Sequence, residues 1–193
     1  LGGYNLLCQF DGDKVTVSDE DNKSATSHYK LEQSAGTVLS FDEYNAVFHY
    51  YSDPSVTDFS YDGKPDGKGF NGDLEFRVLS TSADSIVMEG KKHGDRIVMV
   101  PMEPNLAWKD YLDKTFAVAD SMADYNNFGI VVDHDTLAAT LDYRCLTVTD
   151  KEGKDFSVPF CVTPKGYTLY EPLSINGKTI KAFDYNGGSE WKD

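Results

Sequence analysis

The sequence has little positive charge for its length. Its 193 residues include 18 lysines and arginines against 32 aspartates and glutamates, and the formal net charge is −14. The acidic residues are spread along the whole chain, so the surface repels the phosphates of nucleic acids and of anionic membranes. We therefore expect no nucleic-acid partner, whereas cationic ligands and metal ions stay open.

Long apolar segments are also lacking. No apolar run approaches the roughly 20 residues that span a bilayer, and no signal-peptide pattern is visible. We expect a chain that is not membrane-spanning. It begins abruptly in strand-like sequence at Leu1 and ends at Asp193 without a recognisable terminus, so we expect a fragment of a longer precursor.

Cysteine is scarce, with only Cys8, Cys145 and Cys161. An odd number argues against a disulfide framework. Cys145 and Cys161 lie on predicted strands joined by a turn at residues 150–155, and counting outward from the turn places them nearly opposite each other. One reading is a cross-strand bridge formed in an oxidising envelope. The other, which the pattern favours, is a pair of buried free thiols.

Motifs that mark catalytic centres are missing. The sequence has no G-x-S-x-G, no H-E-x-x-H and no C-x-x-C, and its four histidines are scattered at positions 28, 49, 93 and 134. These motifs place a nucleophile on a strand–helix turn or collect metal ligands on one face. We therefore expect a protein that is not an enzyme and has no transition-metal site.

Short alternating segments dominate the first hundred residues. Apolar residues make up 40% of the chain and aromatic residues 13%, enough to build a core. About eight strand-like runs follow each other at short spacing, and Asp11-Gly12-Asp13 between two of them is a strong hairpin signal. Residues 19–26 are polar and acidic and are predicted to be a loop. We expect residues 1–102 to form an antiparallel, barrel-like β unit.

The period changes from two to about 3.6 between Asn105 and Tyr125. Such spacing is typical of one face of an amphipathic helix, and Asn105 after Pro104 is a plausible N-cap. Asp110 and Lys114 are spaced to pair on its outer face. We expect a connecting helix within residues 103–126. Its apolar face consists of Trp108, Tyr111, Leu112, Thr115, Phe116, Ala119 and Met122.

Strand patterns return after the helix. Residues 141–149 are predicted to form one strand, residues 156–162 form another, and Asn176-Gly177 marks a type I′ hairpin. We expect residues 127–193 to be a second, smaller β unit, truncated at its C-terminus. The predicted fold is mainly β: an antiparallel meander forming a lipocalin-like barrel or half-barrel, a central amphipathic helix, and the second antiparallel unit.

A long segment without periodicity, residues 52–73, holds the candidate binding residues. A loop of this length in a compact domain is usually mobile or functional. Exposed aromatic rings stack on sugars or anchor protein partners; the alternative is that these rings fold back and cap the barrel end. The predicted ligand-binding residues are Tyr50, Tyr51, Phe59, Tyr61 and Phe70.

Aspartates of the same segment are the candidate metal ligands. Calcium takes six to eight oxygen ligands, and Asp62, Asp66 and Asp73 supply carboxylates here. Their spacing does not match an EF-hand, and the alternative is a solvated polar loop. No other cofactor is expected.

Several segments of the sequence together carry a resemblance to one family, namely residues 2–7, 29–31, 38–45, 48–54, 89–92 and 159–160. The chain is similar to an uncharacterised family of cell-surface lipoproteins from Bacteroidetes-type bacteria. The resemblance implies a lipid-anchored precursor at the cell surface or in the periplasm, in the genomic company of outer-membrane nutrient-uptake systems. It implies no reaction.

Two functions follow from these patterns. We expect a non-enzymatic surface module that binds a glycan, a peptide or a partner protein, such as an outer-membrane protein, through the long loop. The alternative is a lipocalin-like carrier of a small apolar ligand, which needs an open barrel interior. A large internal cavity favours the carrier, and a filled barrel with exposed aromatic residues favours the surface module.

Overall fold

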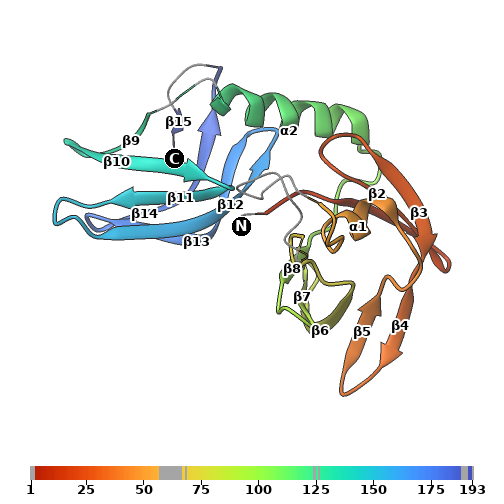
Figure 1. Ribbon diagram of the computed structural model, residues 1–193. Helices are drawn as coiled ribbons and strands as arrows, with labels where there is room; N and C mark the ends of the chain where they lie inside the picture. Colours follow the sequence, from red (N-terminus) through yellow and green to blue (C-terminus); the bar gives the residue numbers. More distant parts are fainter. Residues whose placement is uncertain are drawn as a thin grey trace. The chain divides into compact units, whose positions relative to one another are not determined.

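The chain folds mainly into antiparallel β-sheets with one long helix in the middle of the sequence. The computed structural model describes residues 3–56, 67, 69–123, 125, 127–187 and 191–192. These include a nearly closed, barrel-like sheet (Figure 1), and the predicted fold class is confirmed. The chain divides into two compact units. Unit 1 comprises Leu1–Asn5, Glu20–Asn22 and Ala107–Asp193, and unit 2 comprises Leu6–Asp19 and Lys23–Leu106.

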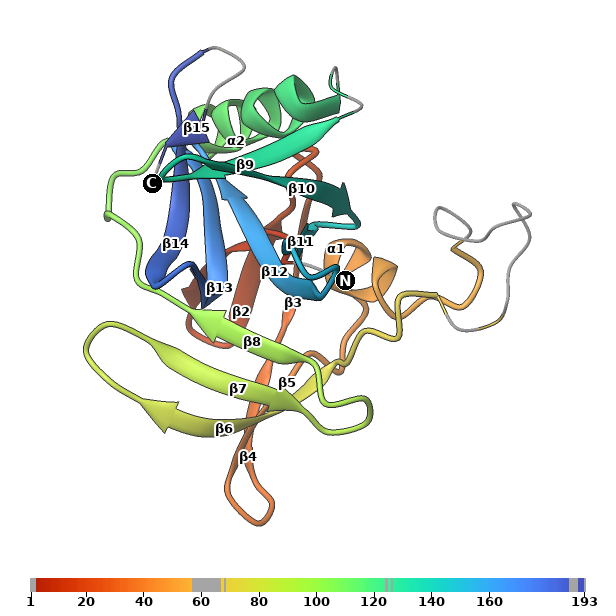
Figure 2. The same ribbon diagram turned by 90° about the vertical axis from the view of Figure 1, so that its left-hand side faces the viewer.

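Unit 2 contains two antiparallel sheets and a short helix. The first sheet has the order β1-β2-β3 and the second β4-β5-β6-β7-β8; Figure 2 shows β6, β7 and β8 side by side. The elements are β1 (Leu7–Asp11), β2 (Lys14–Ser18), β3 (Ser24–His28), β4 (Lys30–Gln33), β5 (Thr37–Ser40), α1 (Ala46–Tyr50), β6 (Glu75–Thr81), β7 (Ile86–Gly90) and β8 (Arg96–Met99).

The β1–β2 hairpin forms where the Asp-Gly turn predicts it, and Gly12 takes the required positive φ of 61°. The predicted loop at 19–26 is wrong in its last residues, because β3 begins at Ser24. Its pairing with β2 lets the Thr16 and Thr26 hydroxyls share a hydrogen bond of 2.8 Å. The unit's core is a single cluster whose fully buried members include Val15, Val17 and Phe41.

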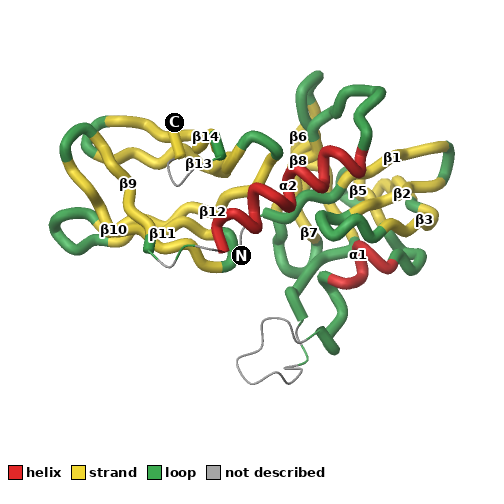
Figure 3. The backbone as a smooth tube through the Cα atoms, turned by 90° about the horizontal axis from the view of Figure 1, so that it is seen from above, coloured by secondary structure: helices red, strands yellow, loops and turns green. Residues whose placement is uncertain are grey.

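Unit 1 is a seven-stranded antiparallel meander beside the long helix. Its sheet order is β15-β14-β13-β12-β11-β10-β9, and Figure 3 shows the helix α2 in red beside β12. The elements are α2 (Trp108–Ala123), β9 (Phe128–Val132), β10 (Asp135–Asp142), β11 (Cys145–Thr149), β12 (Asp155–Thr163), β13 (Gly166–Ile175), β14 (Lys178–Tyr185) and β15 (Trp191–Lys192).

One hydrophobic cluster packs against the inner face of this sheet. Strands alternate buried and exposed residues, as in β12, where Val158, Phe160 and Val162 point inward. Strands β9 to β14 and α2 all contribute to the cluster. The Asn176-Gly177 hairpin is confirmed, with φ values of 51° and 76°.

Helix α2 differs in detail from its prediction. It begins at Trp108 rather than after Asn105, because Leu106 donates to the Glu103 carbonyl and closes a separate turn. Its buried face contains Val118, whereas Phe116 is 52% exposed. The ion pair on its outer face joins Lys109 and Asp113 at 2.5 Å, not Asp110 and Lys114. None of the helices described is long and apolar enough to cross a bilayer.

The segment predicted as one strand at 141–149 is two strands. A tight turn at Tyr143 and Arg144, with φ values of 45° and 57°, separates β10 from β11. The register between β11 and β12 places Cys145 opposite Pro159, two residues away from Cys161. All three cysteines are free thiols of intermediate burial, so Cys145 and Cys161 are not bridged, and they are only partly buried rather than buried as the second reading expected.

Candidate functional site

Three of the five predicted ligand-binding aromatic residues meet in unit 2. Helix α1 positions two of them, and its N-cap Asn45 holds the helix on the sheet. The Asn45 side-chain oxygen accepts from the N–H groups of Val47 and Phe48, at 3.1 and 3.2 Å, and its amide donates to Ser27. Val47 and Phe48 are buried and anchor α1. The position of Tyr50, the last residue of this helix, is therefore fixed by the same turn.

The chain then returns so that Phe70 lies against these tyrosines. Gly72 donates to the Tyr51 carbonyl at 2.8 Å, and a Cβ at Gly72 would lie 2.8 Å from Tyr51 atoms. Gly69 has a φ of 54°, and a Cβ there would lie 2.3 Å from the carbonyl oxygen of Asp53. Only glycine combines this close approach with such a backbone conformation.

The three rings form a compact cluster. The ring centroids of Tyr50 and Tyr51 are 5.5 Å apart, those of Tyr50 and Phe70 5.5 Å, and those of Tyr51 and Phe70 5.7 Å. The Lys23 ammonium lies 5.7 Å from the Tyr50 centroid. All three rings are half-buried, so each keeps part of its surface open to solvent. We call Tyr50, Tyr51 and Phe70 the aromatic cluster. Phe59 and Tyr61 lie outside the described residues, and the ligand-binding role stays a prediction.

Asp73 is buried and holds the loop between β7 and β8. Its carboxylate accepts the N–H groups of Lys92, His93 and Gly94 at 2.9 to 3.2 Å. Three consecutive N–H groups facing one carboxylate make an anion nest. A Cβ at Gly90 would lie 1.8 Å from the carboxylate, so glycine is needed there for the close packing.

The calcium prediction rests on residues that the structure covers only in part. Asp62 and Asp66 lie outside the described residues. At Asp73 the backbone donors already surround the oxygens that would bind a cation. Within the described ranges, no three His, Cys, Asp or Glu side chains gather as a metal site would need.

Unit 1 contains a buried ion pair that the sequence patterns do not reveal. Arg144 donates from Nη1 to Glu20 Oε1 at 2.7 Å and from Nη2 to the other Glu20 oxygen. The side chains are 16% and 10% exposed. The pair joins residues 124 positions apart, and two nonadjacent charges carry no local signal. Bidentate geometry of this kind is the strongest that arginine makes.

The first residues of the chain complete this polar cluster. Gly3 bridges to Cys161 in parallel, donates to the Phe160 carbonyl at 3.0 Å and accepts from Arg144 at 2.9 Å. Asn5 donates to Glu20 at 2.7 Å from its backbone and to the Val162 carbonyl at 2.6 Å from its side chain. We call residues 3–5 the N-terminal segment.

Burial controls the protonation of the neighbouring groups. It raises the pKa of the Tyr170 hydroxyl to about 12. Burial first, and then the Glu20 carboxylate, raise the pKa of the Cys161 thiol. A protonated thiol is a poor nucleophile, so the cluster around Glu20 and Arg144 is suited to holding chain segments together rather than to nucleophilic chemistry.

Comparison with known proteins gives a family without an assigned reaction. No curated protein and no solved structure matches the chain. A family model described as a domain of unknown function, DUF4302, matches residues 1–187. That range includes the N-terminal segment, the Glu20–Arg144 pair and the aromatic cluster, and the chain therefore belongs to the DUF4302 family.

Proposed function

We propose that this chain is a non-enzymatic module of a cell-surface lipoprotein, accessory to outer-membrane nutrient uptake, that binds a neutral glycan through the aromatic cluster. The observation that carries the proposal is the convergence of Tyr50, Tyr51 and Phe70 within 5.7 Å of one another. The apolar faces of sugar rings pack on such aromatic side chains, and tyrosine hydroxyls add hydrogen bonds.

Two further observations support this choice of ligand. The formal net charge of −14 disfavours anionic polysaccharides, because long-range repulsion lowers their local concentration. In unit 1 the inner face of the sheet is occupied by its own hydrophobic cluster, which disfavours a wide lipocalin-like interior. The lipid anchor and the envelope location follow from the family resemblance of the sequence.

The test is affinity electrophoresis of the folded chain in gels containing one soluble polysaccharide each. We expect a neutral glucan, xylan or mannan to retard migration and a polyuronate to leave it unchanged. Phe70→Ala and Tyr50→Ala each remove one ring, worth about 1.4 kcal/mol, and should weaken retardation about tenfold. Tyr44→Ala is the matched control, since Tyr44 is 72% exposed and lies outside the cluster.

The outcome decides between ligand classes. Retardation by a neutral polysaccharide that is lost in Phe70→Ala and kept in Tyr44→Ala supports the proposal. Absence of retardation in every gel, or equal retardation of Phe70→Ala and the parent chain, refutes it and points to a peptide or protein partner. Melting curves of the variants show whether any loss comes from unfolding.

A further inference from the structure

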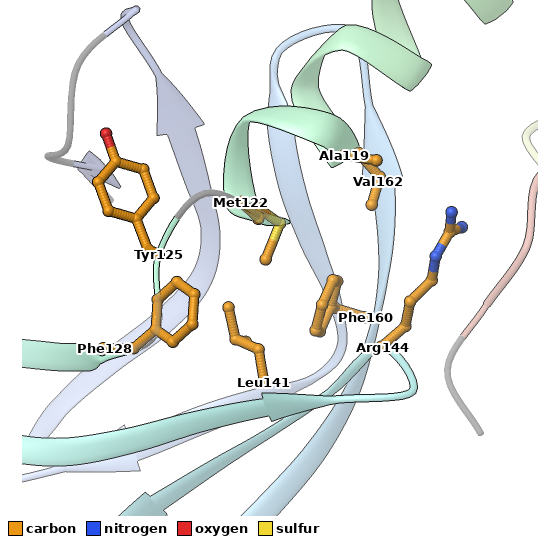
Figure 4. A pocket seen from close by; sticks show the side chains of 8 residues that line it. All are labelled: Ala119, Met122, Tyr125, Phe128, Leu141, Arg144, Phe160 and Val162. Atoms are coloured by element: carbon orange, nitrogen blue, oxygen red, sulfur yellow. The ribbon is translucent and has the colours of Figure 1, made fainter.

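Unit 1 contains a pocket beside the C-terminal half of α2, open to solvent on one side, that the glycan proposal does not use. It has a volume of about 300 Å³ and is bounded by α2 and by strands β9, β10 and β12. Figure 4 shows the rings of Phe128 and Phe160 on either side of Leu141, with Met122 above them. Ala119 and Val162 complete the apolar wall.

Ala119 on α2 is the smallest side chain that lines this pocket. Phe160 and Val162 are 2% and 1% exposed and form a rigid floor. Ala119, Met122, Phe128 and Leu141 are only partly buried and pack around them. A larger side chain at position 119 is therefore expected to occupy part of this space.

The lining determines the charge of a ligand. Among the described residues that line the pocket, Arg144 is the one that is charged, and its guanidinium is engaged by both Glu20 oxygens and the Gly3 carbonyl. It also lies 4.2 Å from the centroid of the Tyr4 ring, and Figure 4 shows it extending away from the phenylalanine rings. The pocket therefore offers no uncompensated charge to an anion, and a charged ligand would lose its hydration without a partner.

The lining also determines the size and shape. A closed engineered cavity of about 150 Å³ lined by aliphatic and aromatic side chains accepts benzene. The pocket here is open on one side and has about 300 Å³, which is room for two fused rings. Aromatic rings prefer the edge and face contacts that Phe128 and Phe160 provide, and the Met122 thioether adapts to them. The Tyr125 hydroxyl adds a polar group at the same pocket.

We propose that this pocket binds a neutral, bicyclic aromatic molecule about the size of indole. The proposal is independent of the glycan site, because the aromatic cluster lies in unit 2 and the pocket residues lie in unit 1. For about ten heavy atoms, the dissociation constant is expected on the order of 10 to 100 µM.

The test is calorimetric titration of the chain with indole and, separately, with naphthalene-1-carboxylate. We expect indole to bind and the carboxylate to bind at least tenfold more weakly. Ala119→Leu fills the pocket and should weaken indole binding at least tenfold. Ala117→Leu is the matched control, since residue 117 is exposed on the same helix, and it should bind indole like the parent chain.

Each remaining result overturns the proposal. Absence of heat and of ligand-detected NMR saturation transfer at 1 mM indole (about ten times the weakest affinity expected) excludes the site. Equal binding of indole to Ala119→Leu and to the parent chain excludes this location. Equal binding of the carboxylate excludes the neutral class. Leu141→Phe, which fills the pocket from the sheet, gives an independent check if Ala119→Leu fails to fold.

Discussion

Removing the charge of Glu20 is expected to destabilise unit 1 strongly. Glu20→Gln keeps the shape of the side chain but leaves the Arg144 guanidinium, 16% exposed, without its counter-charge. Breaking a buried pair from one side costs about 3 to 5 kcal/mol. We expect about 3 kcal/mol, because the glutamine oxygen still accepts from Asn5, which donates to Glu20 from both its backbone and its side chain.

Urea denaturation followed by tryptophan fluorescence measures this loss. Both tryptophans, Trp108 and Trp191, belong to unit 1, so the signal reports the unit that contains the pair. Asp113→Asn is the matched control: it breaks the Lys109–Asp113 pair, whose side chains are 76% and 46% exposed, and should cost under about 0.5 kcal/mol. If Glu20→Gln lowers the unfolding free energy no more than Asp113→Asn, the reasoning about burial is refuted.

Three smaller predictions concern single groups. Burial raises the pKa of the Cys8 thiol from 9.0 to about 12, so its thiolate is about 1000-fold scarcer at pH 8. Peptide mapping after iodoacetamide treatment should therefore find Cys8 modified only in urea. Equal labelling of Cys8 without urea would contradict this prediction. Burial first, and then Asp73, raise the pKa of Asp95 above 3.8. The folded state therefore binds this proton more tightly, and stability falls as pH rises from 3.8 through the folded pKa. Asp95→Asn should flatten that part of the stability curve, and an unchanged slope would count against it. Gly3→Ala would place a Cβ 1.7 Å from the Tyr170 hydroxyl and should cost about 1 to 3 kcal/mol; adding Tyr170→Ala should restore part of it, and a parental melting curve for Gly3→Ala would exclude the clash.

Local turn chemistry is what the sequence predicts best. The turns at Gly12 and at Asn176-Gly177 form where predicted, because glycine and asparagine, the residues that most readily adopt positive φ, can be recognised in the sequence. The turn at Tyr143 and Arg144 has the same backbone geometry without such residues. A bulky side chain at positive φ is costly in isolation, and the bonds that Arg144 makes to Glu20 and Gly3 offset that cost. The prediction of one continuous strand therefore failed where tertiary contacts outweigh local preference.

Contacts between distant residues explain the other gaps. The aromatic cluster could be anticipated because its residues crowd within one segment of sequence. The register that places Cys145 opposite Pro159, two residues from Cys161, is set by the turn between β11 and β12, so an error of one or two residues in that turn changes every cross-strand neighbour. The buried face of α2 also depends on distant contacts. Val118 rather than Phe116 is buried, because the orientation of the helix is set by the strands against which it packs.

The N-terminal segment imposes an order on folding. Asn5 finds its partner carbonyl 157 residues further along the chain, whereas the strands of unit 2 pair almost entirely with their sequence neighbours. Contacts of such long range form late, because closing the intervening loop costs entropy before any contact is gained. During synthesis unit 2 can fold while residues 3–5 and 20–22 wait for β11 and β12 to leave the ribosome. Until then the Glu20 carboxylate and the backbone of the N-terminal segment lack their partners. During this interval the nascent chain is most open to wrong contacts between its strands.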